Sequence, residues 1–147
     1  TQRNMRETGL RDARTIGDGF RTAEIPVGAV YASELCRAQE TAYIAFGRAG
    51  LLPALNLCCV DGRPLSNQQR LEFIRRMVTL APPDGVNTVI VAHGVGIMAD
   101  LAMGEAAIYK PDGEGGASRL ARVMPGEWAG GLYRKDLRGI DQSGNRE

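Results

Sequence analysis

An uninterrupted apolar run that stops at a histidine constrains the fold of this chain more than any other feature. Thr88 to Ala92 reads TVIVA, and it is followed by His93, the only histidine among 147 residues, and by Gly94. A short strand that is apolar at consecutive positions is typical of a parallel sheet covered on both faces. Because ligands of open α/β sheets bind at the carboxyl ends of strands, His93 is predicted to lie where a ligand binds.

Helical and extended patterns alternate along most of the chain. Apolar residues at three- and four-residue steps predict helices over 7–20, 35–48, 66–81 and 96–103. Ser66 and Gln69 match a capping box, which marks the start of the third helix. Strands are predicted over 27–33, 55–60, 88–92, 106–110 and 118–124. The alternation predicts one α/β domain over 1–136, with helices covering a mostly parallel sheet, and a polar tail over 137–147.

Charge and composition narrow the range of partners. The 18 Lys and Arg balance 17 Asp and Glu, which gives no indication of a nucleic-acid or membrane partner. A single histidine without an acidic cluster does not favour a metal site, and we predict no cofactor. The three cysteines, Cys36, Cys58 and Cys59, are an odd number and are interpreted as reduced thiols.

Two functional interpretations of His93 follow from its surroundings. Gly94 to Ala99 reads GVGIMA, which matches a dinucleotide fingerprint, with Asp112 or Glu114 as the ribose-binding acid. This motif comes late in the chain, however, and both acids lie in a predicted turn. The favoured hypothesis makes His93 a phosphate ligand beside a helix N-terminus, with Arg37 as the cation that grips the oxyanion.

Three motifs carry a resemblance to a known family. They are SELCRAQETA from Ser33, VIVAHG ending at Gly94, and MRETGLRDARTIG from Met5. Together, over roughly residues 1–130, they resemble the histidine phosphatase superfamily, which includes the cofactor-dependent phosphoglycerate mutases, and a small bacterial branch of it. The resemblance implies a three-layer α/β/α sandwich and a phosphomonoester hydrolase that passes the phosphoryl group through a phosphohistidine to water.

The same resemblance assigns residues to roles. Arg37, Ser33 and Gly94 would bind a small phosphorylated substrate, and His93 would be the second histidine, which supports the transferring group. The general acid is open, with Asp61 and Glu105 as candidates, and of the two we predict Glu105 to be catalytic. Oligomeric state stays open, and so does the compartment, either cytoplasmic or exported.

Departures from the family pattern are as informative as the matches. The family nucleophile lies in an Arg-His-Gly or Arg-His-Ala motif on the first central strand, and these 147 residues contain no such motif. We therefore expect an upstream strand in a longer parent protein, which would supply the nucleophile. The alternative is a phosphate-binding pseudoenzyme that does not catalyse. Arg6 also stands where the family has a Ser or Thr helix cap, a loss worth about 1 kcal/mol.

Overall fold

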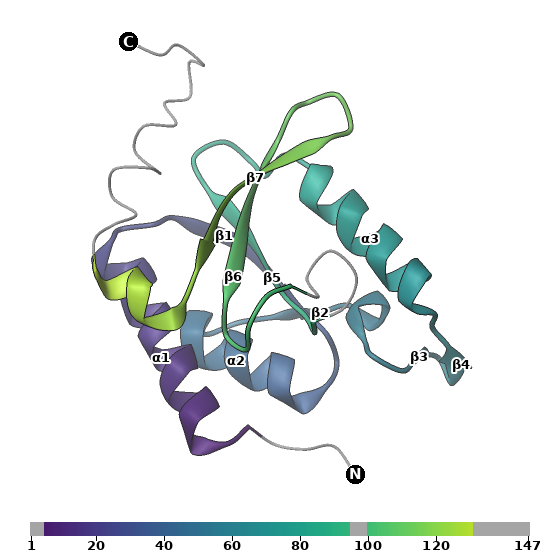
Figure 1. Cartoon of the computed structure of the whole chain (residues 1–147), viewed down its shortest axis with the longest axis horizontal. Helices are drawn as coiled ribbons and strands as arrows, with labels where there is room; N and C mark the ends of the chain where they lie inside the picture. The colour runs from purple at the N-terminus through teal and green to yellow at the C-terminus, as the bar shows by residue number, and fades with distance from the viewer. Residues whose placement is uncertain (1–4, 95–99, 131–147) are drawn as a thin grey trace.

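The structure is a computed structural model that describes residues 5–94 and 100–130 (Figure 1). Its α-helices are α1 (Glu7–Thr22), α2 (Cys36–Phe46) and α3 (Asn67–Thr79). Its strands are β1 (Val27–Ala32), β2 (Gly50–Leu51), β3 (Cys59–Val60), β4 (Arg63–Pro64), β5 (Asn87–Val91), β6 (Ala106–Pro111) and β7 (Ala117–Val123). Two 3₁₀ helices, η1 (Pro53–Leu55) and η3 (Pro125–Gly130), complete the described elements. The predicted α/β class is confirmed.

A parallel sheet with the order β2-β1-β5 forms the centre of the fold. β1 and β5 run side by side, with Ala32 opposite Val91 near their carboxyl ends. β6 and β7 form an antiparallel hairpin, and β3 and β4 form a second, much smaller one. The two predicted strands that flank the candidate site, β1 and β5, are therefore adjacent.

Helix α2 packs on the central pair of strands through small residues. Val30 and Ala32 of β1 meet Ala38 and Ala42 of α2 in one buried cluster, in which each is at most 3 % exposed. Alanine at these positions brings the helix backbone close to the sheet. This close packing fixes where the N-terminus of α2 lies relative to the ends of β1 and β5.

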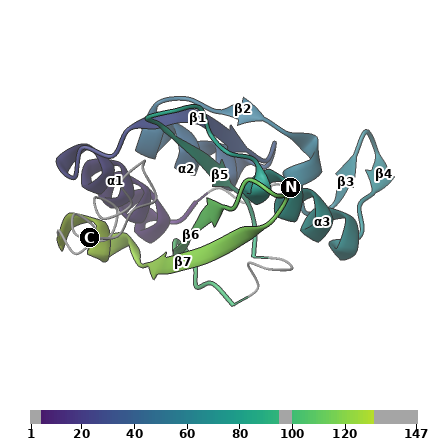
Figure 2. The ribbon, with the colours of Figure 1, turned by 90° about the horizontal axis from the view of Figure 1, so that it is seen from above.

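Helix α1 packs against both α2 and η3, as Figure 2 shows for α1 and η3. Both contacts depend on glycine. A Cβ on Gly17 would lie 2.4 Å from the carbonyl oxygen of Ala45, and one on Gly19 would lie 2.3 Å from the Cβ of Trp128. Trp128 is buried against Phe20, with ring centroids 4.4 Å apart. Gly17, which was predicted on the apolar face of this helix, and Gly19 are therefore close-approach positions.

The helix starts behave as the sequence predicts. Ser66 caps α3, since its hydroxyl accepts from the backbone N–H of Gln69 and the Gln69 side chain accepts from the backbone N–H of Ser66. Arg6 occupies the N-cap of α1 and makes no side-chain capping bond. Helix α3 buries Ile74 and contacts β6 and η1.

The strand predicted over 55–60 is wrong. Pro53 starts a 3₁₀ turn that runs to Leu55, and only Cys59–Val60 is extended, paired with Arg63–Pro64. Proline cannot donate to a strand ladder, and the buried side chain of Asn56 replaces ladder bonds with bonds to Glu34. The third strand of the parallel sheet is instead the short Gly50–Leu51.

Two of the predicted segments lie partly or wholly outside the described residues. Half of the helix predicted over 96–103, residues 96–99, and the whole tail over 137–147 lie outside them. The helix prediction is wrong for the described half, 100–103, which is a turn and irregular backbone; the backbone N–H of Ala102 donates to the Glu105 carboxylate there. Within the described residues, no helix is both long enough and apolar enough to cross a membrane.

Candidate oxyanion site

The adjacent ends of β1 and β5 bring Ser33 and His93 together. Ser33 follows β1 directly, and its backbone N–H donates to the carbonyl of Val91 at the end of β5. Its Oγ lies 2.7 Å from Nε2 of His93, at hydrogen-bonding distance. Since neighbouring parallel strands end at the same sheet edge, two residues 60 positions apart in sequence meet there. Ser33 is completely buried, so this contact is fixed in position.

The N-terminus of α2 opens at the same corner. Leu35 is the N-cap and supplies no side-chain cap, and the first turn contains no acidic residue. Arg37 lies in that first turn, and its side chain is exposed. A cation at the positive end of a helix is unfavourable unless an anion binds there. The positive end of the α2 dipole, together with Arg37, therefore suits a bound oxyanion.

His93 is held as a neutral imidazole. Burial lowers its pKa below the ordinary value of 6.5, and the positive charges of Arg37 and Arg70 lower it further. The Oγ of Ser33 already accepts the backbone N–H of Leu35, at 3.2 Å. This arrangement favours the Ser33 hydroxyl as donor to Nε2, which leaves the imidazole proton on Nδ1. The ring can thus donate one hydrogen bond without carrying a charge.

Arg70 is a functional candidate that the sequence reasoning missed. It lies in α3 and is only 6 % exposed. Nη1 donates to the carbonyl of Leu65 at 2.8 Å and to that of Leu57, and Nη2 donates to Oδ1 of Asn67. Its Nε is buried without a hydrogen-bond partner in the described part of the chain. Helical spacing could have identified Arg70, because it lies four residues before the buried Ile74 and so on the same face.

Asn56 is a second residue that sequence reasoning missed. It is 5 % exposed, its Oδ1 accepts from the backbone N–H of Glu34, and its Nδ2 donates to a carboxylate oxygen of Glu34, both at 2.8 Å. These two bonds fasten the residue between Ser33 and the start of α2. Asn56 therefore supports the corner that carries the candidate site.

Glu105, predicted as a catalytic residue, lies in an ion-pair network at the β6–β7 hairpin. Its carboxylate accepts from Arg122 at 2.8 Å and from the backbone N–H of Ala102. The hydrogen bond from Arg122 is the main cause that lowers the pKa of Glu105 to about 2. A general acid must hold a proton near neutral pH, so this environment favours a structural role for Glu105.

The remaining predicted residues, Asp61, Gly94 and Asp112, make no hydrogen bond or ion pair with one another in the described part of the chain. Asp61 is exposed in the β3–β4 turn, with a left-handed backbone (φ 49°). Gly94 follows His93 and is exposed. Asp112 caps the hairpin turn, since its carboxylate accepts the backbone N–H groups of Glu114 and Gly116, and these bonds lower its pKa. Asp112 is thus occupied within its own turn, and the dinucleotide fingerprint at 94–99 lies largely outside the described residues.

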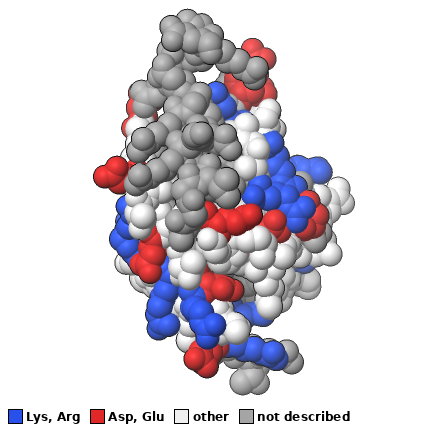
Figure 3. Space-filling view, turned by 60° about the vertical axis from the view of Figure 1, so that its left-hand side comes forward, with Lys and Arg blue, Asp and Glu red and all other residues white. Residues whose placement is uncertain are grey.

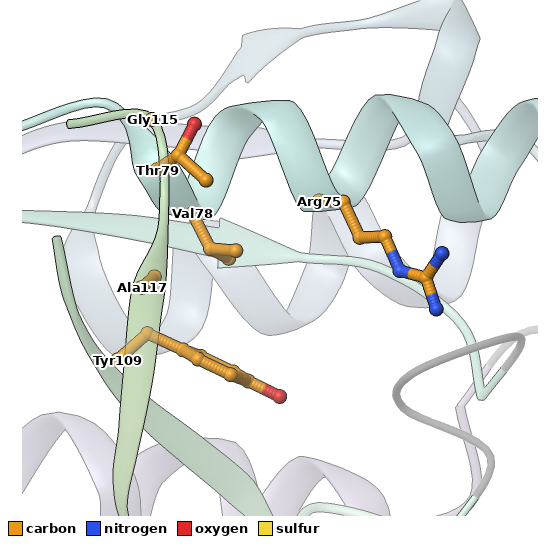
Figure 4. Close-up of a pocket in the computed structure, with 6 residues that line it drawn as sticks. All are labelled: Arg75, Val78, Thr79, Tyr109, Gly115 and Ala117. Atoms are coloured by element: carbon orange, nitrogen blue, oxygen red, sulfur yellow. The ribbon is translucent and has the colours of Figure 1, made fainter. Parts of the chain in front are cut away.

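A separate hollow of about 320 Å³ lies between α3 and the β6–β7 hairpin. In Figure 4, Arg75 and Val78 extend from α3, and Tyr109 extends from β6 beneath Val78. None of the sequence-predicted site residues lines it. The described residues also contain no group of His, Cys, Asp or Glu that could hold a metal ion.

The charged surface is mixed in sign. Figure 3 shows one face on which Lys and Arg side chains lie among Asp and Glu side chains. The ion pairs of Asp100 with Arg119 and of Glu105 with Arg122 are examples of such pairing in the chain. Arg37 and Arg70, by contrast, have no carboxylate partner among the described residues.

The fold is similar to that of a histidine phosphatase, as the motifs predicted. One solved structure with this fold is that of the protein histidine phosphatase SixA complexed with tungstate. The match has a TM-score of 0.54 and 14 % sequence identity, and it covers 84 % of this chain and 85 % of that chain. No family model and no curated protein sequence matches the chain.

Proposed function

We propose that the chain is the larger part of a histidine-type phosphomonoester hydrolase. Arg37 and Gly94 bind the phosphate, the buried Ser33 orients His93 through its hydroxyl, and His93 donates a hydrogen bond to the phosphoryl group as it is transferred. The observation that carries this proposal is the junction of β1, β5 and α2, where His93 contacts Ser33 beside the N-terminus of α2 and the charges of Arg37 and Arg70 help to lower its pKa. Positive groups aimed at the equatorial oxygens are the main requirement of phosphoryl transfer.

The proposed reaction has two steps. A histidine nitrogen of the parent protein attacks phosphorus, the bond to the ester oxygen breaks, and the leaving oxygen takes up a proton. Water then attacks the phosphohistidine, which releases phosphate and restores the histidine. The one histidine of this chain, His93, is the supporting histidine in this scheme, so the nucleophile lies outside these 147 residues. Glu105 is left outside the reacting group because it is ionised and paired.

Strand pairing supports a place for the segment that carries the nucleophile. Among the described residues, β5 pairs only with β1, and β6 pairs only with β7. Both strands therefore have an edge whose backbone groups are available for a further strand. In our proposal an upstream strand pairs with β5 and β6, completes a three-layer sandwich and ends in Arg-His-Gly or Arg-His-Ala beside His93.

The substrate class is a small phosphorylated molecule. The similar structure of SixA was determined with tungstate, a tetrahedral oxyanion, and this supports an oxyanion as ligand. A phosphatase is preferred to a mutase because the chain has no evident insertion to hold a sugar phosphate. The alternative is a phosphate-binding pseudoenzyme; a dinucleotide-binding domain is the least supported reading, because Asp112 is engaged in its turn.

Oxyanion binding can be followed directly, because His93 gives the only imidazole NMR signals of the chain. Titration with tungstate or inorganic phosphate is expected to shift these signals saturably. Arg37→Ala should weaken binding by about tenfold, the effect of losing a charged hydrogen-bond donor. Arg11→Ala, which removes an exposed arginine of α1, is the matched control and should leave the affinity unchanged. An unshifted imidazole at saturating anion would refute the site.

Catalysis is tested separately. The 147-residue chain and a longer chain that includes the natural upstream segment are assayed for hydrolysis of p-nitrophenyl phosphate. Only the longer chain is expected to hydrolyse it. Peptide mapping of the trapped phosphohistidine should place it in the upstream segment. If the longer chain binds phosphate but does not hydrolyse the ester, the pseudoenzyme alternative is correct.

A further inference from the structure

We propose that Cys58 and Cys59 form a reversible oxidation site, with a peroxide as oxidant, whose state controls oxyanion binding at Arg37 and His93. The thiol chemistry stands on its own geometry. Its effect on oxyanion binding rests on the proposed function.

The two thiols are neighbours in space as well as in sequence. Their Sγ atoms lie 2.9 Å apart, and Cys58 is exposed. The hydrogen bond to Cys58 is the first cause that raises the pKa of Cys59, which keeps the Cys59 thiol protonated. Either sulfur can donate to the other, and Cys58 is the more exposed of the two, so its sulfur is the one placed to meet an oxidant.

The oxidation is balanced with hydrogen peroxide alone. The thiolate of Cys58 attacks one peroxide oxygen, the O–O bond breaks, and a sulfenic acid and water form. The sulfur of Cys59 then attacks the sulfenic sulfur, and the S–O bond breaks as the S–S bond forms and a second water leaves. Two thiols and one peroxide thus give one disulfide and two waters, and a dithiol reductant reverses the change by exchange.

Closing this disulfide must move the backbone. Consecutive Cα atoms are about 3.8 Å apart across a trans peptide, whereas disulfide-bonded residues usually have Cα atoms about 4.4–6.8 Å apart. The ring therefore distorts the peptide between Cys58 and Cys59. Strained disulfides are more easily reduced than relaxed ones, which makes the change reversible.

The distorted peptide belongs to the loop that supports the candidate site. The carbonyl of Cys58 accepts the backbone N–H of Leu65 at 3.0 Å, and the carbonyls of Leu65 and Leu57 both accept from Arg70. Arg70 is one of the two charges that act on His93. A shift at Cys58 thus reaches His93 through the carbonyls that hold Arg70.

A second connection runs through Asn56. Its Nδ2 donates to the carbonyl of Cys59 at 3.3 Å and to the carboxylate of Glu34 at 2.8 Å. Glu34 follows Ser33 at the start of the α2 corner. Oxidation therefore disturbs the site from two directions, and we expect it to weaken oxyanion binding.

The chemical half of the proposal is tested by mass spectrometry. Peroxide treatment should lower the mass of the tryptic peptide 49–70, which holds both thiols, by two hydrogen atoms, and a dithiol should restore it. Cys58→Ser and Cys59→Ser each abolish this loss. Cys36→Ser, whose thiol falls in peptide 22–37, is the matched control and leaves it intact. Oxygen addition without loss of two hydrogens would overturn the disulfide.

The functional half uses the His93 signals. Phosphate affinity of the oxidised chain should fall about fivefold, roughly the effect of one hydrogen bond, and recover on reduction. The same treatment should leave the affinity of Cys58→Ser unchanged. Disulfide formation with unaltered affinity overturns the coupling. If the reduced chain itself binds no phosphate, the proposed function fails, while the peptide masses still decide whether the thiol site exists.

Discussion

Two clusters of charge in this molecule have opposite designs. At the β6–β7 hairpin, Arg119 and Arg122 are each paired with a carboxylate, from Asp100 and Glu105. At the junction of β1, β5 and α2, Arg37 and Arg70 lie near a neutral histidine, and no described carboxylate pairs with either. We call the first the closed cluster, because carboxylates of the chain balance its arginine charges. We call the second the open cluster, because its positive charge is left for an external anion to neutralise.

The difference separates structural from functional charges better than residue type does. Glu105 was predicted to be catalytic because carboxylic acids assist leaving groups, yet its partners keep it ionised. Arg70 was not a candidate in the sequence, yet it is buried and its charge is one of the causes that lower the pKa of His93. Within the described residues, the arginines of the hairpin have carboxylate partners, whereas Arg37 and Arg70 at the candidate oxyanion site have none.

Removing Arg70 should produce the largest effect on stability. Arg70→Met leaves the carbonyls of Leu57 and Leu65 without their donor, and we expect the free energy of unfolding in urea to fall by about 3 kcal/mol. The pKa of His93 should rise, because one of the charges that lower it is gone. Arg76→Met, on the exposed side of the same helix, should change stability by less than about 0.5 kcal/mol. Equal effects of the two variants would show that Arg70 is an ordinary surface charge.

Loss of the Ser33 hydroxyl should have a smaller effect, concentrated at the oxyanion site. Ser33→Ala removes the partner of His93 and the acceptor of the Leu35 N–H from a fully buried position, for a loss of about 1.5 kcal/mol. Its NMR signature is a changed tautomer balance of the His93 ring. Ser118→Ala on the exposed part of β7 should be neutral in both measurements. If the His93 ring keeps its tautomer in Ser33→Ala, the Ser33 hydroxyl does not set the tautomer of His93, and its role in the site is refuted.

The sequence predicted the parts of this site that depend on regular elements. Periodicity predicted β1, α2 and β5, and parallel pairing brings the ends of β1 and β5 together, where Ser33 and His93 are in contact. That these residues and Arg37 bind a phosphate stays a prediction. Arg70 was missed although it lies in the regular helix α3, since the carbonyls of Leu57 and Leu65 that hold it come from outside that helix. Asn56 was missed because it lies in an irregular stretch. Pro53 turns the chain there into a 3₁₀ helix, and what the chain does next is decided by tertiary hydrogen bonds that no periodic pattern records.

Acid should act on the closed cluster in a defined range of pH. The folded pKa of Glu105, about 2, lies below its ordinary value of 4.5, so its stabilising contribution is complete above about 4.5 and is lost as the pH falls toward 2. Glu105→Gln should flatten the pH dependence of the urea midpoint in that range. Glu72→Gln, on an exposed position of α3, should retain it. A wild-type slope in Glu105→Gln would mean that the ion pair with Arg122 contributes nothing.

The weakest pH effect should come from the open cluster, at a higher pH. His93 has a folded pKa below 6.5, so as the pH falls through 6.5 the unfolded chain takes up the proton first and the folded state loses stability. With one group the slope cannot exceed about 1.36 kcal/mol per pH unit, and His93→Gln should abolish it. Sulfate, whose charge is constant over this range, should raise the folded pKa by stabilising the imidazolium and so reduce the slope. A slope that sulfate leaves unchanged would mean that anions do not reach the charge at this junction. The two clusters would then differ only in how their arginines are paired, not in their ability to bind an anion.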